Sequence, residues 1–131
     1  MGWWADTAVA VISAVIEPGP GAVHGPHNFA PDQVWQLAEI VSHYQASGRR
    51  ETYLGDWHSH PNESSGRLSW IDRQVLRRII HSPEARCDRP LMAVLWGEPE
   101  AWQTEMCHAC LRPRRIIWDR LVVEPADLRV Y

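Results

Sequence analysis

The chain has 131 residues, of which 45% are hydrophobic and 22% charged, with a formal net charge of −3. This length and apolar content suffice for one domain with a sizeable core. The negative charge excludes a general electrostatic attraction to nucleic acid, so we expect no nucleic-acid partner. Two local arginine clusters are interpreted as a solvated helix face and a turn: Arg73, Arg77 and Arg78, then Arg112, Arg114 and Arg115.

The apolar segment at 8–16 is too short to span a bilayer. Asp6 is the only charged residue before it, so the basic region of a signal peptide is lacking. We therefore expect no membrane association and a cytoplasmic protein with reduced cysteines.

The predicted elements alternate between strands and helices. The first half is predicted to contain a strand at 7–16 buried on both faces, a turn at 18–22, a loop through His24, His27 and Pro31, and a helix over 32–46 that Gly48 stops. A strand over 52–58 follows, and then a helix from Ser69 to about His81, with Ile71, Val75, Ile79 and Ile80 near one face. The remaining predicted elements are a strand over 91–96 and late strands over 101–109 and 114–123. This order predicts an α/β fold, with a mixed central β-sheet flanked by helices.

Two histidines separated by one residue lie at the end of the strand predicted over 52–58. On an extended backbone, the side chains of His58 and His60 project to the same face. Pro61 is expected to end the strand. Asp72 lies in the first turn of the next predicted helix, where it can point back toward the strand. Two imidazoles and one carboxylate leave the fourth position of a tetrahedral zinc site free for water, as in hydrolytic sites.

Ser69 and Asp72 also have a purely structural interpretation. Their spacing is that of a capping box, in which the serine accepts from the third amide and the acid reaches back. Capping and metal binding are compatible, because Ser69 can cap the helix while its hydroxyl faces the metal pocket. Trp57 and Trp70 flank the proposed ligands, and Trp57 is expected to pack beneath the site. The other five histidines are expected in loops or on the surface: His24, His27, His43, His81 and His108.

The segment from Gly55 to Pro61 (Gly-Asp-Trp-His-Ser-His-Pro), with Ser69 and Asp72, resembles the motif of the JAMM/MPN metalloprotease family, especially its bacterial branch. The resemblance extends over most of the chain, including the turn at 18–21 and Asn28-Phe29. It implies the JAMM/MPN fold, with cytidine-deaminase-like layering. It also implies that His58, His60 and Asp72 bind Zn²⁺ and that Ser69 holds the oxyanion of the tetrahedral intermediate.

The chain departs from the family pattern in two places. Eleven residues separate His60 from Asp72, one more than the family usually has, which a loop can absorb at low cost. The glutamate segment that supplies the family's general base has no match. Because residues 1–4 resemble the end of that segment, we expect a single domain over 1–131 that lacks the family's first strand. Asp56 is the only nearby substitute for the glutamate. A carboxylate is needed to move protons even where zinc activates water.

Three cysteines are present, and two of them have a Cys-x-x-Cys spacing that can bind zinc. One such pair, Cys107 and Cys110, is a weak signal, and Cys87 is its only further potential ligand. A zinc deaminase is excluded, because the chain has no His-x-Glu and no proline before Cys107.

Three functions are consistent with the sequence. The resemblance implies a zinc-dependent metallopeptidase that cleaves an amide or isopeptide bond at the C-terminus of a ubiquitin-like protein, with E1- or E2-like proteins as further partners. A second is a hydrolase that releases a small adduct, such as cysteine, from a sulfur-carrier protein. The third is an inactive metal-binding scaffold, supported by the missing glutamate.

Overall fold

The computed structural model describes residues 1–25, 29–98, 100–113 and 119–129. The chain divides into two compact units, Met1–Leu54 and Gly55–Tyr131. The single-domain organisation stays a prediction. Neither described helix is both long and apolar enough to cross a membrane.

The first unit holds two small antiparallel sheets and one helix. β1 (Gly2–Trp4) pairs with β2 (Ala10–Ile12), and β3 (Val23–His24) pairs with β4 (Phe29–Ala30). The strand predicted at 7–16 is therefore wrong in extent, because only three of its residues join a ladder. A continuous apolar run does not by itself specify how much of it finds a pairing partner.

The helix predicted over 32–46 is confirmed as α1 (Gln33–Ala46). Asp32 caps its N-terminus, where the carboxylate accepts a hydrogen bond from the amide of Trp35 at 3.1 Å. Beyond the C-cap Ser47, Gly48 adopts a φ of 66°, the left-handed conformation that commonly ends a helix.

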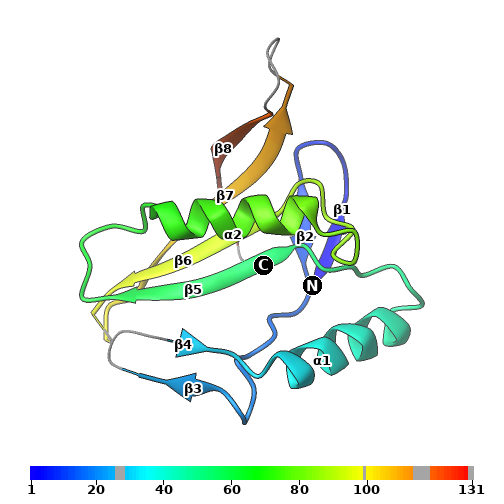
Figure 1. Cartoon of the computed structure of the whole chain (residues 1–131), viewed down its shortest axis with the longest axis horizontal. Coiled ribbons are helices and arrows are strands. Elements are labelled where there is room, and N and C mark those ends of the chain that lie inside the picture. The colour runs from blue at the N-terminus through cyan, green and yellow to red at the C-terminus, as the bar shows by residue number, and fades with distance from the viewer. Residues whose placement is uncertain (26–28, 99, 114–118, 130–131) are drawn as a thin grey trace. The chain divides into compact units, whose positions relative to one another are not determined.

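The second unit contains a mixed four-stranded sheet in the order β5-β6-β7-β8, which confirms the predicted fold class (Figure 1). Its strands are β5 (Gly55–Pro61), β6 (Leu91–Gly97), β7 (Gln103–Arg112) and β8 (Arg120–Ala126). β5 and β6 are parallel, and the other neighbouring pairs are antiparallel. The predicted strands lie within a few residues of these, but β5 starts later and includes Pro61. The part of the last predicted strand at 114–118 lies outside the described residues.

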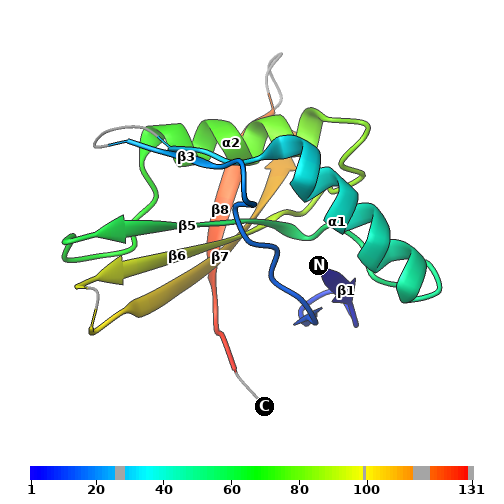
Figure 2. The same cartoon turned by 90° about the horizontal axis from the view of Figure 1, so that it is seen from below.

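The helix predicted from Ser69 is confirmed as α2 (Trp70–His81), which connects the parallel strands β5 and β6. α2 lies across one face of the sheet (Figure 2). Between helix and sheet lies a core of Leu76, Met92, Val94 and Ala109. Ile71 was expected on the inner side of this helix, but it is 66% exposed. Full burial of the four core residues is the dominant stabilising contribution to this unit.

Candidate metal centre

The two histidines of the motif lie near the carboxyl end of β5. His58 is in register with Val94 of β6, and His60 with Trp96. Because side chains alternate across a strand, His58 and His60 share the face that carries Val94, the face covered by α2. In a β-helix-β unit, the helix begins at the edge where the first strand ends. The N-terminus of α2 is thereby brought to the two imidazoles.

Asp72 reaches the site because it belongs to the inward stripe of α2. The three buried residues of this helix are Asp72, Leu76 and Ile79, spaced four and three residues apart as on one helical face. Leu76 and Ile79 are apolar and anchor the helix. The first position of the stripe is instead a carboxylate, which is also the one buried charged residue in the described part of the chain.

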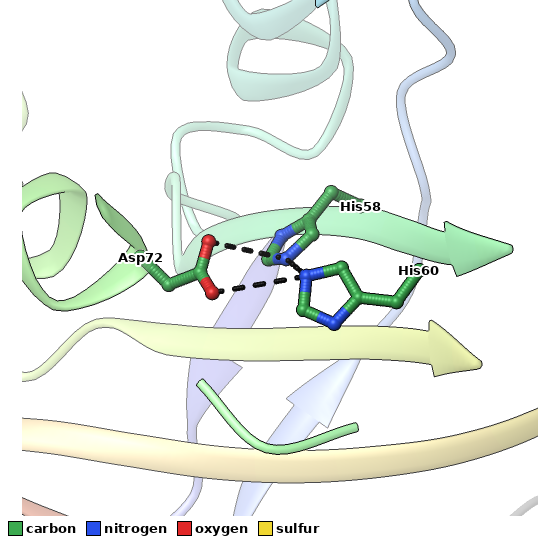
Figure 3. A group of neighbouring side chains, drawn as sticks. All are labelled: His58, His60 and Asp72. Atoms are coloured by element: carbon green, nitrogen blue, oxygen red, sulfur yellow. Dashed lines mark hydrogen bonds and ion pairs between the residues drawn. The ribbon is translucent and has the colours of Figure 1, made fainter. Parts of the chain in front are cut away.

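The three side chains converge at short distances (Figure 3). The Nε2 atoms of His58 and His60 are 3.0 Å apart. His58 Nε2 lies 3.3 Å from Asp72 Oδ1, and His60 Nε2 lies 3.8 Å from Asp72 Oδ2. Four ligands placed tetrahedrally about zinc would be roughly 3.3–3.6 Å apart, given metal–ligand distances of about 2.0–2.2 Å. The observed separations therefore fit a metal site with one carboxylate and two imidazoles.

The lowered pKa of His58 favours the neutral imidazole that metal binding needs. Burial lowers the pKa of His58 below its usual value, and neighbouring His60 lowers it further, while Asp72 and Asp56 act in the opposite direction. A neutral imidazole is the form that binds a metal, so the lone pair of His58 Nε2 is available near neutral pH. The side chains of His58 and His60 remain 27% and 22% exposed, which keeps the group open to solvent.

Ser69 caps α2 and holds Asp72 at the same time. Its Oγ accepts a hydrogen bond from the Asp72 amide at 3.2 Å, and its own amide donates to Asp72 Oδ2 at 2.6 Å. The predicted capping box is thus confirmed. The hydroxyl oxygen acts as an acceptor here, so its proton is left for another interaction. The oxyanion role of Ser69 stays a prediction that this geometry allows.

Of the described residues, Asp72 alone contributes a carboxylate to the group of converging ligand atoms. Asp56 lies two positions before His58 on the same strand face and acts electrostatically on it. It does not join the converging ligand atoms, and its role as a substitute base stays a prediction. Trp57 projects to the face of β5 opposite His58, as its expected place beneath the site requires, and it is 39% exposed, so its packing role stays a prediction.

The Cys-x-x-Cys pair lies within β7, in register with Met92 and Val122 of the neighbouring strands. Residues three apart on a strand project to opposite faces, so Cys107 and Cys110 cannot hold one ion between them. Burial raises the pKa of Cys107 and of Cys87 to about 11. These thiols are therefore protonated and inert near neutral pH.

Two contacts in the second unit are not predicted from the sequence. Gly66, in the loop before α2, donates its amide hydrogen to Glu105 Oε1 of β7 at 3.2 Å. His108 was expected on the surface or in a loop, yet it lies on β7 beside Glu124, with Nε2 to Oε2 at 3.6 Å. Both pairs join residues far apart in sequence, and no local pattern signals them.

Comparison with known proteins agrees with this geometry. A family model described as prokaryotic homologs of the JAB domain matches residues 1–111. A protein of Sinorhizobium fredii (strain NBRC 101917 / NGR234), named probable metalloprotease y4qB, is 45% identical over 131 residues. That match covers the whole of this chain and 80% of the relative.

Proposed function

Because this chain belongs to the family of prokaryotic homologues of the JAB domain, and is thereby a hydrolase of the metalloprotease type, we propose that it cleaves an amide or isopeptide bond at the C-terminus of a ubiquitin-like protein. The observation that carries the proposal is that the ligand atoms of His58, His60 and Asp72 converge at the N-terminal end of α2.

The metal we propose is zinc, held by His58, His60 and Asp72. Two imidazoles with one carboxylate form a ligand set typical of catalytic zinc, which leaves a coordination position open. When bound, zinc acidifies water and polarises a carbonyl group. The partial exposure of both imidazoles leaves a path for a substrate carbonyl to approach the group.

The protein side chains then have separate tasks. His58 and His60 present neutral nitrogens from a strand, whereas Asp72 contributes a negative charge from the N-terminus of α2, where the helix dipole stabilises it. Ser69 donates its hydroxyl proton to the oxygen that becomes negative as the carbonyl is attacked. Removing one such donor from an enzyme typically costs about 10²–10³-fold in rate.

A ubiquitin-like substrate is proposed from the motif that the chain shares with bacterial JAMM proteins. E1- and E2-like proteins are the further partners that this function implies, and a cytoplasmic location follows from the same proposal. Genes for such proteins beside this one would support deconjugation over the processing of a sulfur-carrier protein.

One specific observation favours a second candidate, an inactive metal-binding scaffold. In the residues that the structure describes, no carboxylate other than Asp72 joins the converging ligand atoms. General acid–base assistance is typically worth about 10²–10⁴-fold in rate. A chain with the ligands and without that assistance would bind metal and hydrolyse its substrate slowly.

The test uses the purified, zinc-loaded chain and two probes. One is a ubiquitin-like protein whose C-terminal carboxylate is joined by an amide to a fluorescent amine, and the other is a sulfur-carrier protein with a cysteine joined at the same position. We expect release of the amine, abolished by chelation of the metal and by His58→Ala. Release from the sulfur carrier alone would transfer the proposal to that substrate. Zinc binding without release from either probe would favour the scaffold.

A further inference from the structure

The loop over residues 62–68 determines where the third ligand lies. It leaves the end of β5 just after His60 and delivers the chain to Ser69 and Asp72. A loop of this length has many conformations, and only some of them bring Asp72 within 4 Å of both imidazoles. A contact that fixes the middle of the loop therefore acts on the metal site.

Gly66 is that fixed point, because it is buried and lies against two strands of the sheet. Its amide donates to the Glu105 carboxylate at 3.2 Å. A Cβ atom at this position would lie 2.7 Å from Trp96 Cδ1 and 2.9 Å from Glu105 Cβ. Real Cβ contacts are longer, so only glycine allows the loop to approach β6 and β7 this closely.

The anchor and the ligands are built on one rigid element. Glu105 of β7 is in register with Val94 of β6, which is in register with His58 of β5. The same row of the sheet thus carries a metal ligand at one end and the loop anchor at the other. From Gly66 the chain is tied again at Ser69, whose amide donates to Asp72 Oδ2 at 2.6 Å.

We propose that Glu105 is a positioning residue for the metal site: its carboxylate holds Gly66 against the sheet and thereby sets Ser69 and Asp72 at the correct distance from His58 and His60. The inference rests on the proposed function, because it takes His58, His60 and Asp72 as metal ligands. Glu105 itself lies two strands from His58 and is not among the converging ligand atoms. It acts through backbone geometry.

The test measures zinc affinity of the full chain by competition with a chromophoric chelator, without any substrate. Partners that orient metal ligands from outside the first coordination sphere typically contribute about 10–100-fold to metal affinity. We expect Glu105→Ala to weaken zinc binding about tenfold and to change the visible spectrum of the cobalt-loaded protein. Glu105→Gln keeps an acceptor oxygen and should stay within about threefold of the wild type.

Two further variants keep the test decisive. Glu124→Ala is the matched control, because it removes the same charge from the adjacent strand β8, where the carboxylate pairs with Arg112 on the opposite face of the sheet. It should leave zinc affinity unchanged. Gly66→Ala should weaken zinc binding by displacing the loop, and its effect should not add to that of Glu105→Ala, since both act on one contact.

Equal zinc affinity of the wild type and a folded Glu105→Ala variant would overturn the inference, as would a Glu105→Gln variant that binds as weakly as Glu105→Ala. Should Glu105→Ala fail to fold, the comparison of Glu105→Gln and Gly66→Ala decides the same question. A wild-type chain that binds no zinc would overturn both this inference and the proposed metal site. A wild type that binds zinc but cleaves no probe would contradict only the proposed substrate.

Discussion

The four-stranded sheet carries a histidine–carboxylate group on each face, and the two groups differ in what neutralises them. On the face covered by α2, His58 and His60 meet Asp72 without a cationic side chain among the three. On the opposite face, Glu124 pairs with Arg112 at 2.8 Å, and Arg89 lies 3.4 Å from His108 Nε2. Arginine occupies the second group where a cation is required. In the first group, the metal ion that we propose would supply the positive charge.

Residue types alone therefore do not identify a metal site. Both groups combine imidazole with carboxylate at a few ångströms, and burial lowers the pKa of His58 and of His108 alike. The difference lies in convergence: the first group directs three ligand atoms toward one point, whereas guanidinium groups flank the second.

The largest expected effect separates the two groups by zinc affinity. We predict that His58→Ala weakens zinc binding by more than about 100-fold, beyond the usual loss on removing an outer partner of a ligand. His108→Ala should leave zinc affinity unchanged. Zinc content and chelator competition on the purified variants measure both values. Equal zinc content in wild type and His58→Ala would disprove the ligand assignment.

A smaller effect concerns the cap that holds Asp72 in the first group. Ser69→Ala should lower the free energy of unfolding by about 1 kcal/mol, because the first turn of α2 loses its side-chain acceptor. Urea denaturation of the metal-free protein measures this change. Ser82→Ala, at the other end of the same helix, is the control, since the Ser82 hydroxyl donates a hydrogen bond to the exposed Glu84 carboxylate. A loss from Ser82→Ala as large as that from Ser69→Ala would contradict the capping role.

The role of arginine in the second group can be tested by titration. Arg89 lowers the pKa of His108, after burial the largest cause, while Glu124 acts in the opposite direction. Arg89→Gln should therefore raise the pKa of His108, measured from its ring resonances by NMR. Arg86→Gln, an exposed residue of the same segment, is the control. An unchanged or lowered pKa in Arg89→Gln would refute the assigned electrostatic role.

The smallest effect is a pH dependence shared by both groups. The pKa values of His58 and His108 are lowered on folding, so the unfolded chain binds these protons more readily. Their contribution to stability is complete above the ordinary histidine pKa of about 6.5 and is lost as the pH falls through the lowered values. Urea unfolding of the metal-free protein at about pH 7.5 and about pH 5.5 should show this loss. His58→Gln should reduce the slope, and an unchanged slope would be evidence against the assigned shift.

Patterns among neighbouring residues were enough to predict the local features of this protein. The spacing of His58 and His60 placed both on one strand face, and the capping signal of Ser69 set the start of α2 to within a residue. Gly48 marked the end of α1 in the same manner. These predictions succeeded because caps and alternation depend on neighbouring residues only.

Apart from the approach of Asp72 to the two histidines, which the motif predicted, contacts between separate segments depended on the tertiary structure. Only three residues of the apolar run at 8–16 found a strand partner, and Cys107 and Cys110 were separated by the alternation of a strand longer than predicted. The contact of Gly66 with Glu105 and the pairing of His108 with Glu124 join residues that are distant in the chain or on neighbouring strands. Such contacts are fixed by sheet register and by burial of the core, which no local pattern specifies.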